Sequence, residues 1–548
     1  MNKILKVHPD DNVIVALKDL AKGETCSLNG EEYVITEAVS AKHKFVQEDI
    51  EIGGDIKMYG VLVGKAQTAL PKGSPITTSN VKHATNPLEI RTSNYQWTPP
   101  DVSAYADKTF QGFLRNDGQA GTANYWLVVP LVFCENRNIM ILKEALNKAL
   151  GYESKSPYQT AVEQFVEVIA TGKGDQIMDL DFPVLSKKKP SSKLFPNVDG
   201  IKFITHQSGC GGTRQDSQSL CGLIAGYITH PNVAGATILS LGCQNAEEST
   251  LMEEINKRSA DFDKPLFILN HQTIGTEKNV IEAGIKNTLM GLSEANKLTR
   301  IPVPLSKLCV GLECGGSDGF SGISANPTLG YFSDMLTALK ASVILSEFPE
   351  LCGVEQELVD RCVDIETAKK FASLMDLYSK SAVNAGSGFD MNPSPGNIKD
   401  GLITDAIKSA GAAKKGGTSP VVAVLDYPEK VTKPGLNLLC TPGNDVESTT
   451  AEVGSGANMV LFTTGLGTPT GNPIAPVLKV SSNTILFEKM TDIIDFNTGT
   501  VIEGSETIEA SAKRLLDLVI SVASGELTAK AVLNNQDDFI PWKRGVSL

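Results

Sequence analysis

The fold class is decided by the segment Leu308-Cys309-Val310-Gly311-Leu312-Glu313-Cys314-Gly315-Gly316-Ser317-Asp318-Gly319. Its apolar run, residues 308–312, ends at once in a turn of glycine and polar side chains. Strands of parallel sheets show this pattern, because both of their faces are covered and the chain must then turn toward a helix. The segment therefore predicts a strand of an α/β sheet with polar chemistry at its carboxyl end.

Other apolar runs repeat this arrangement along the chain, each followed by a polar or glycine-rich turn. The runs are residues 126–133, 202–205, 236–241, 266–269 and 342–345. Longer helical patterns separate them, as in parallel βα units. Ligands of open α/β sheets bind outside the carboxyl ends of the strands, so we expect these turns to line one crevice.

Three folded units and one linker are expected. Residues 1–85 contain short β-branched runs between turns and predict a small all-β domain. Residues 86–107 carry three prolines and predict a linker. Residues 108–390 predict an α/β domain that carries the strand-end cysteines, and residues 391–548 a second α/β domain, both with mainly parallel sheets. Within the first, residues 151–200 include a lysine-rich stretch that we expect to be a solvated loop.

Composition and charge exclude several classes of protein. The chain has 548 residues, 41% of them hydrophobic, with 49 glycines and 27 prolines. These values fit several globular domains and exclude a small module or a low-complexity chain. The formal net charge of −13 argues against general binding of nucleic acid or an anionic membrane.

Location and redox state also follow from the sequence. The longest apolar stretch, residues 125–133, contains a proline and has about half of the roughly 20 residues that a membrane span needs. The N-terminus meets acidic residues before an apolar core could form, so it is not a secretory signal. We therefore expect a cytoplasmic protein. Its ten cysteines form no CxxC pair and are expected to be thiols or ligands, not disulfides.

Three cysteines stand at predicted strand ends beside glycine: Cys210, Cys243 and Cys314. Thiolates there could hold iron, zinc or copper(I). The alternative is that they are small buried residues whose glycine neighbours permit close packing.

Histidines and carboxylates at other strand ends could move protons. His206 and His271 follow predicted strands, and His43 lies between two lysines that suit a carboxylate ligand. Glu347 ends the strand at residues 342–345, and Asp318 follows Cys314. A structural role for each histidine, and helix capping for Asp318, are the alternatives.

Several segments together resemble the altronate/galactarate dehydratase family, over nearly the whole chain. They are residues 42–45 with 59–64, 209–210, 241–245, 311–319, 392–397, 434–439, 442–445 and 464–469. The N-terminal unit is similar to the SAF (β-clip) domain of that family.

The resemblance implies loss of water from a sugar acid, such as conversion of D-altronate to 2-dehydro-3-deoxy-D-gluconate in hexuronate catabolism. A base must remove the proton beside the carboxylate, and a general acid must protonate the leaving C3 hydroxyl. The enediolate between these events needs a metal or fixed donors. The family implies a divalent metal, for which we expect Fe²⁺, with Mn²⁺ as the alternative.

The resemblance also implies roles for the strand-end residues. The expected metal ligands are Cys210, Cys243 and Cys314. The expected catalytic residues are His43, His206 and Glu347. The expected substrate contacts are Lys44, Gln244, Asn245, Ser317 and Asp318.

The expected partners are a small sugar acid and a second copy of the chain in a homodimer, with neither nucleic acid nor membrane. Two other functions stay open. One is a galactarate or other sugar-acid dehydratase or lyase of the same family. The other, from a different class, is an iron–sulfur or metal-sensing protein that uses the three cysteines.

Overall fold

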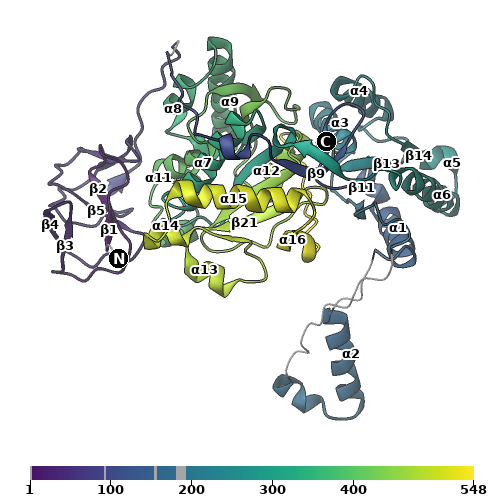
Figure 1. Ribbon diagram of the computed structural model, residues 1–548, viewed down its shortest axis with the longest axis horizontal. Coiled ribbons are helices and arrows are strands. Elements are labelled where there is room, and N and C mark those ends of the chain that lie inside the picture. The colour runs from purple at the N-terminus through teal and green to yellow at the C-terminus, as the bar shows by residue number, and fades with distance from the viewer. Residues whose placement is uncertain (1–2, 92–93, 153–156, 181–192) are drawn as a thin grey trace.

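A computed structural model describes residues 3–91, 94–152, 157–180 and 193–548 (Figure 1). The N-terminal unit is all β. Its strands are β1 (Ile4–Leu5), β2 (Val13–Ala16), β3 (Thr25–Leu28), β4 (Glu31–Val34), β5 (Lys44–Val46), β6 (Asp55–Met58), β7 (Val61–Ala66) and β8 (Val81–Lys82). They form two small sheets, β1-β2-β5 and β6-β7-β8, and the hairpin β3-β4. Ile14, Tyr33 and Phe45 form part of one core of this unit. The predicted small β domain is confirmed.

Described residues of the segment between β8 and η1 contact the part of the chain that follows residue 305. Arg91 forms an ion pair with Asp360, and the Tyr95 hydroxyl donates to the carbonyl of Thr418. The segment ends at η1 (Ser103–Tyr105), before a small antiparallel sheet in the order β10-β9-β15. Its strands are β9 (Thr109–Leu114), β10 (Ala120–Gly121) and β15 (Ile301–Pro304).

The second unit is built on a four-stranded parallel sheet in the order β12-β11-β13-β14. Its strands are β11 (Tyr125–Pro130), β12 (Gly200–Phe203), β13 (Val233–Ser240) and β14 (Leu266–Asn270). Its helices are α1 (Asn136–Ala149), α3 (Arg214–Thr229), α4 (Glu248–Arg258), α5 (His271–Ile274) and α6 (Glu277–Ala295). Helices α1 and α6 cover the face around Trp126, and α3 and α4 cover the other face. Strands β11 and β13 are buried along their whole length, which explains their continuous apolar sequence.

The third unit is built on a seven-stranded parallel sheet in the order β18-β19-β17-β16-β20-β21-β22. Its strands are β16 (Cys309–Cys314), β17 (Ser342–Leu345), β18 (Val421–Leu425), β19 (Gly435–Leu439), β20 (Met459–Thr464), β21 (Val477–Ser481) and β22 (Phe496–Asn497). The segment that opened the sequence analysis is its central strand. The predicted α/β fold class, with mainly parallel sheets, is confirmed.

Helices of the third unit cover both faces of this sheet. They are α7 (Ala325–Ala338), α8 (Glu355–Asp360), α9 (Ile365–Asn384), α10 (Pro395–Lys399), α11 (Asp405–Ala412), α12 (Asp445–Gly454), α13 (Thr484–Lys489), α14 (Gly499–Glu503), α15 (Ile508–Ala523) and α16 (Lys530–Leu533). Leu515 and Val519 lie on the buried stripe of α15 and pack in the large core. Helix α12 packs against α3, so the second and third units share a core.

The strand pairing divides the chain between β14 and β16. We expected β16 and β17 in one unit with the earlier strands, but they pair with β20 and β19. The division expected at residue 390 therefore lies inside the unit built on the seven-stranded sheet. These pairings join residues more than 90 positions apart, and no local pattern in the sequence marks them.

The insertion at residues 151–200 is helical in part, where we expected a loop. Helix α2 (Pro157–Ala170) and η3 (Gly174–Asp179) project from the body of the molecule (Figure 1). Val162, Val166 and Ile169 recur at helical spacing on α2, although all three are exposed. Most of the lysine-rich stretch, at residues 187–193, lies outside the described residues. In the part of the chain that the structure covers, no helix combines the length and apolarity of a membrane span.

Candidate active site

Chemically active side chains gather at the carboxyl edge of the seven-stranded sheet. Glu313 and Cys314 end β16, Glu347 follows β17 by two residues, and Asp445 begins α12 after β19. Ser482 follows β21 at the same edge. Because all seven strands are parallel, these strand ends face one side. We expected the turns after all six predicted strands to line one crevice, but those after β11, β12, β13 and β14 belong to the other sheet.

Cys314, Glu347 and Glu350 form the centre of this edge. The Cys314 Sγ lies 3.3 Å from Glu347 Oε2 and 3.2 Å from Glu350 Oε2. One ligand atom from each residue lies within 4.8 Å of the other two. Their exposed fractions are 2%, 1% and 3%. The geometry thus groups one thiol and two carboxyls in a space that bulk water does not reach.

Two lysines hold the carboxyls of this centre. Lys415 Nζ donates to Glu347 Oε2 over 2.7 Å, and both residues are almost fully buried. Lys408 Nζ lies 2.7 Å from Glu350 Oε1, which also accepts from Asn392 Nδ2. Each carboxyl is therefore oriented by one cation, and each has one oxygen toward Cys314.

Two more glutamates lie buried behind the centre. Ser448 Oγ donates to Glu313 Oε1 over 2.6 Å, and Ser346 Oγ bridges Glu313 Oε2 and Glu452 Oε1. With Asp445, five carboxyls surround two lysines at this edge. The local charge is negative unless protons or a cation compensate it.

The pKa values at this edge follow from burial and carboxyl crowding. Burial, and then the charges of Glu347 and Glu452, raise the pKa of Glu313 well above its ordinary value. Burial also raises the pKa of Glu347, that of Glu452 to about 8 and that of Asp445 to about 6. Such raised values mark groups that bind a proton readily, or a metal in its place.

Glu350 and Cys314 depart in opposite directions. Burial acts to raise the pKa of the Glu350 carboxyl, but Lys408 and Lys415 outweigh it and the pKa lies below the ordinary value. Burial and the two carboxylates raise the pKa of the Cys314 thiol well above the ordinary value. The thiol therefore stays protonated unless a cation stabilises its thiolate.

The residues at this centre fit a divalent cation. Glu347 Oε1 is buried and has no hydrogen-bond partner, although its carboxyl lies in the middle of the group. Glu347 also adopts φ +63°, a left-handed conformation that costs a residue with a side chain about 1–2 kcal/mol. A strained backbone and an unsatisfied oxygen at one residue point to a functional constraint.

A second cluster surrounds Asp318, where the N-terminal domain meets the third unit. The fully buried Asp318 carboxylate accepts from Ser321 N and Oγ, Ser482 Oγ and Asn483 Nδ2. Lys42 Nζ, from the N-terminal domain, lies 3.1 Å from Asp318 Oδ2 and 2.9 Å from Asp400 Oδ1. The β domain thus contributes a cation to the edge of the sheet.

Lys44 and His43 lie at the same junction. Lys44 Nζ donates to Gly401 O over 2.6 Å, and burial lowers the pKa of Lys44 to about 7. His43 Nε2 lies 3.0 Å from Lys399 O, and its ring stays partly exposed. Ser317 is buried, and its carbonyl accepts from Asn397 Nδ2. Of the sequence-predicted site residues, the structure brings Cys314, Glu347, Ser317, Asp318, Lys44 and His43 to this edge.

Cys210, Cys243 and His206 lie on the other sheet. Cys210 follows β12 and Cys243 follows β13, and both are exposed. His206 is buried; its Nε2 lies 2.7 Å from Pro130 O, and its Nδ1 accepts from Ser208 N. Burial lowers the pKa of His206. Backbone groups occupy both of its nitrogens, so this ring positions a loop.

Gln244 and Asn245 belong to the Cys243 loop. The Gln244 side chain is buried and bonds Gly242 N and Ser240 Oγ. Asn245 is exposed and donates to Gly212 O over 3.4 Å. The expected contact of these two amides with a substrate held at Cys314 therefore has no counterpart in the described geometry.

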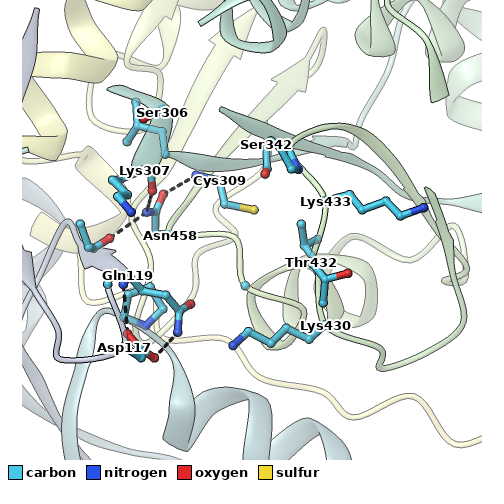
Figure 2. A pocket seen from close by; sticks show the side chains of 17 residues that line it. Asp117, Gln119, Ser306, Lys307, Cys309, Ser342, Lys430, Thr432, Lys433 and Asn458 are labelled. Atoms are coloured by element: carbon cyan, nitrogen blue, oxygen red, sulfur yellow. Dashed lines mark hydrogen bonds between the residues drawn. The ribbon is translucent and has the colours of Figure 1, made fainter. Parts of the chain in front are cut away.

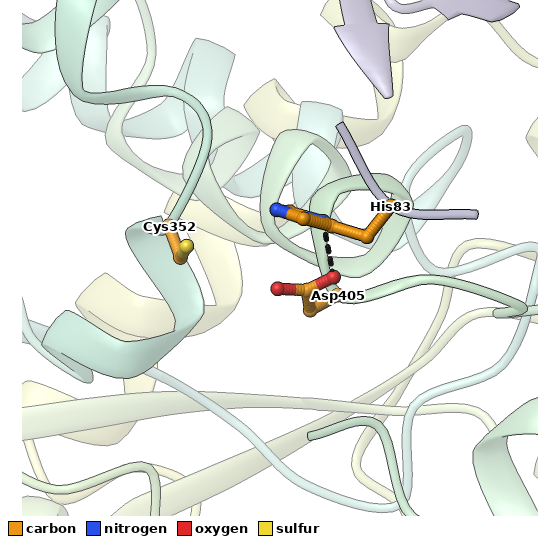
Figure 3. A group of neighbouring side chains, drawn as sticks. All are labelled: His83, Cys352 and Asp405. Carbon is orange, nitrogen blue, oxygen red and sulfur yellow. Dashed lines mark ion pairs between the residues drawn. The ribbon is translucent and has the colours of Figure 1, made fainter. Parts of the chain in front are cut away.

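A second group with metal-ligand chemistry joins the end of the N-terminal domain to the third unit. His83 forms an ion pair with Asp405, and Cys352 lies beside them (Figure 3). The hydrogen bond that His83 donates to Asp405 raises the pKa of His83. The trio ties the residue directly after β8 to the start of α11 and to the segment that contains Cys352.

A cavity of 330 Å³ lies at the opposite edge of the seven-stranded sheet (Figure 2). Cys309 and Ser342, the first residues of β16 and β17, line it together with Lys430 and Asn458. Because ligands of open α/β sheets bind at the carboxyl ends of strands, this cavity at the amino ends is a poor candidate for the active site.

Sequence reasoning missed Glu350, Lys408 and Lys415. Glu350 stands three residues after Glu347, a spacing that places both on one side of the 3₁₀ turn η5 (Phe348–Leu351). This spacing could have indicated that Glu350 belongs to the same site as Glu347. Lys415 follows another lysine and precedes two glycines, which is typical of an exposed turn, yet it is 1% exposed.

The fold and the site define an α/β protein with an added β domain and a buried thiol–carboxylate centre that fits a divalent cation. Three family descriptions match the chain: "Altronate/galactarate dehydratase SAF domain" at residues 2–84, "D-galactarate dehydratase/Altronate hydrolase, second domain" at 112–296 and "D-galactarate/Altronate dehydratase, C-terminal" at 305–547. The chain belongs to the altronate/galactarate dehydratase family, which are hydro-lyases of sugar acids.

Three relatives match over nearly their full length. The chain is 34% identical to an altronate dehydratase of Bacillus subtilis (strain 168), with 100% of both chains covered. It is 32% identical to an altronate dehydratase of Escherichia coli (strain K12), with 99% of each covered. It is 30% identical to a galactarate dehydratase (L-threo-forming) of the same strain, over 95% of this chain and 93% of the relative.

Proposed function

We propose that this protein removes water from D-altronate to give 2-dehydro-3-deoxy-D-gluconate, with a divalent metal held at Cys314, Glu347 and Glu350. The single observation that carries the proposal is this buried group of one thiol and two carboxyls at the carboxyl edge of the sheet. The two altronate dehydratase relatives that span the whole chain support the choice of substrate.

The metal would be Fe²⁺, since a thiolate beside carboxylates suits a metal of intermediate softness. When bound, it would polarise the substrate carboxylate and so make the C2 proton more acidic. The unpartnered Glu347 Oε1 is the free ligand oxygen, and Lys408 and Lys415 hold the carboxyls in place. Asp445 and Glu313 would stay beside the centre as proton-binding groups.

The chain's own residues would handle the protons. A base takes the C2 proton, the C2–C3 enol forms as the C3–O bond breaks, and an acid gives its proton to the departing hydroxyl, so that water leaves. His43 is the proposed acid/base, because it stands between Lys42 and Lys44 where the β domain meets Asp318. The enol then ketonises to the 2-keto product.

The acidic side chains of the site explain why binding of a sugar acid needs cations. An anionic sugar acid would meet five carboxyls at this edge, which disfavours its entry unless positive charge compensates. Lys42 is shared between Asp318 and Asp400 and so does not leave a full positive charge. A divalent cation at Cys314 would supply the missing charge.

A panel of sugar acids tests the proposal. Anaerobically purified protein is incubated with D-altronate, D-mannonate, D-gluconate and galactarate, and 2-keto acid is measured. D-Mannonate differs from D-altronate only at C3, the carbon that loses its hydroxyl, and is the matched control. We expect turnover of D-altronate alone, lost with a chelator and restored by Fe²⁺. Absence of turnover of every acid with Fe²⁺ present would refute the function.

Galactarate is the second candidate substrate. The full-length similarity to a galactarate dehydratase favours it. It carries a carboxylate at each end, so it needs a second cationic contact. Turnover of galactarate in place of D-altronate in the same panel would move the proposal to this substrate and leave the metal centre unchanged.

A further inference from the structure

Three thiols lie at the carboxyl edge of the four-stranded sheet. Cys134 lies in η2 (Phe133–Glu135), directly after β11. Cys210 follows β12, and Cys243 follows β13. These strands are neighbours in the order β12-β11-β13, and they are parallel. Their loops therefore emerge side by side on one edge of the sheet.

The three loops are bonded to one another. Phe133 N, beside Cys134, donates to Ser208 O over 3.0 Å. Ala246 N, in the Cys243 loop, donates to the carbonyl of Gly209, beside Cys210, over 3.1 Å. Gly209 has φ +103°, and a Cβ there would lie 2.1 Å from Leu131 O. Only glycine allows the Cys210 loop to pack so closely on the Cys134 loop.

Exposure separates these thiols from the rest. Of the ten cysteines, all within the described residues, Cys134, Cys210 and Cys243 are exposed, and the other seven are buried or half-buried. Burial raises the pKa of each of those seven. Free cysteine is normally among the most buried residues, so three exposed thiols on three adjoining loops call for a ligand.

We propose that Cys134, Cys210 and Cys243 are the protein ligands of an iron–sulfur cluster of the four-iron type. Their three sulfur atoms do not all lie within 4.8 Å of one another. One tetrahedral metal at about 2.3 Å from each sulfur would bring the sulfurs to about 3.8 Å. A cluster spreads its thiolates more widely, because each is bound to a different iron.

Three thiolates leave one iron of such a cluster without a cysteine. That position is open to a water or an oxygen ligand. Gln272 Nε2 donates to Cys243 Sγ over 3.2 Å, and His271 pairs with the buried Glu135, which follows Cys134. Hydrogen bonds to cluster sulfurs tune the reduction potential. The side chains around the thiols thus include the polar groups that a cluster site uses.

This centre is distinct from the one at Cys314. Cys314 is buried on the seven-stranded sheet and is bonded to Glu347 and Glu350. We expected Cys210 and Cys243 to share a metal with Cys314, but the strand order gives them Cys134 as a neighbour. The inference does not rest on the proposed function.

Iron and sulfide analysis tests the cluster. The full chain is purified anaerobically, or reconstituted with Fe²⁺ and sulfide, and iron and acid-labile sulfide are measured per chain. We expect about four sulfides and, with the Fe²⁺ proposed at Cys314, about five irons, together with visible charge-transfer absorption and an EPR signal after reduction. Cys134→Ser, Cys210→Ser and Cys243→Ser should each lose most of the sulfide and the colour. Cys362→Ser is the control; its half-buried thiol donates to Leu358 O, a bond that serine retains.

Four outcomes would refute the cluster. Two are absence of sulfide from wild type after reconstitution and binding of iron without sulfide. The others are a loss of sulfide from Cys362→Ser as large as from the three thiol variants, and a disulfide between two of the three thiols. Glu347→Gln separates this inference from the proposed function. If it keeps about four irons and four sulfides but does not dehydrate D-altronate, both hold. A wild type that lacks sulfide yet dehydrates D-altronate refutes the cluster alone.

Discussion

The two parallel sheets of this protein end in opposite environments. At the edge of the four-stranded sheet, Cys134, Cys210 and Cys243 are exposed on adjoining loops. At the edge of the seven-stranded sheet, Cys314 and its carboxyl partners are buried beside α11 and α12. Both edges come from the same strand–turn pattern. The covering elements, and not the strands, decide whether an edge presents open thiols or crowded carboxyls.

The buried edge gives the largest expected effect. Glu347→Gln removes the charge of the carboxyl with the unpartnered oxygen and leaves Lys415 without its ion-pair partner. We expect kcat/KM for D-altronate to fall by about 10²–10⁴, the range of a lost acid/base or ligand group, together with loss of bound Fe²⁺ from the centre. Steady-state kinetics and metal analysis of chelator-treated, Fe²⁺-reloaded protein measure both.

Glu366→Gln is the matched control for this variant, since Glu366 is exposed on α9 and pairs with Lys369. It should retain wild-type kinetics. Unchanged turnover in Glu347→Gln would show that this carboxyl takes no part in the reaction. The difference between the two edges would then have no consequence for catalysis.

The β domain, which meets this edge at Asp318, gives the next effect. His43→Asn removes a titratable ring but keeps a polar side chain near Lys399 O. We expect kcat to fall by about 10²-fold with KM and Fe²⁺ content nearly unchanged, because proton transfer is lost while substrate and metal binding are kept. His8→Asn, at an exposed site of the same domain, is the control. A rise in KM alone would assign His43 to substrate binding.

Carboxyl crowding at the buried edge predicts a pH-dependent stability. Burial raises the pKa of Asp445 to about 6, above its unfolded value near 4. The folded state therefore binds the proton more tightly than the unfolded state. The resulting contribution of Asp445 to the free energy of unfolding is complete below about pH 4 and is lost as the pH rises through 6. Between pH 4 and 7 we expect wild type to lose ~2 kcal/mol of unfolding free energy relative to Asp445→Asn.

Urea unfolding of chelator-treated protein at several pH values measures this difference, because a bound cation would replace the proton at the centre. Glu429→Gln, in an exposed ion pair with Lys370, supplies a reference curve that should run parallel to wild type. Parallel curves for wild type and Asp445→Asn would show that the pKa of the Asp445 carboxyl is not raised in the folded state.

The sequence predicted the strands and the strand-end chemistry, because both are local patterns. Residues 308–319 indicated β16 and the thiol at its end, and Glu347 was predicted from the end of β17. The pairing of β16 with β20 and the burial of Lys415 depend on contacts between distant segments. Cys134 was not predicted as a site residue, because the prediction relied on adjacent glycines. The feature that the three exposed thiols share is their position after neighbouring strands.

The smallest expected effect lies at the exposed edge. Gln272→Ala removes the amide that donates to Cys243 Sγ over 3.2 Å. A donor stabilises the reactive thiolate, and one hydrogen bond contributes about 1 kcal/mol, or about fivefold in an equilibrium. In cluster-free protein, we therefore expect alkylation of Cys243 to slow about fivefold, while Cys210 reacts at the wild-type rate. Mass spectrometry of alkylated peptides over time gives both rates in one sample. An equal change at both thiols would mean that Gln272 supports the whole loop assembly and not the one sulfur.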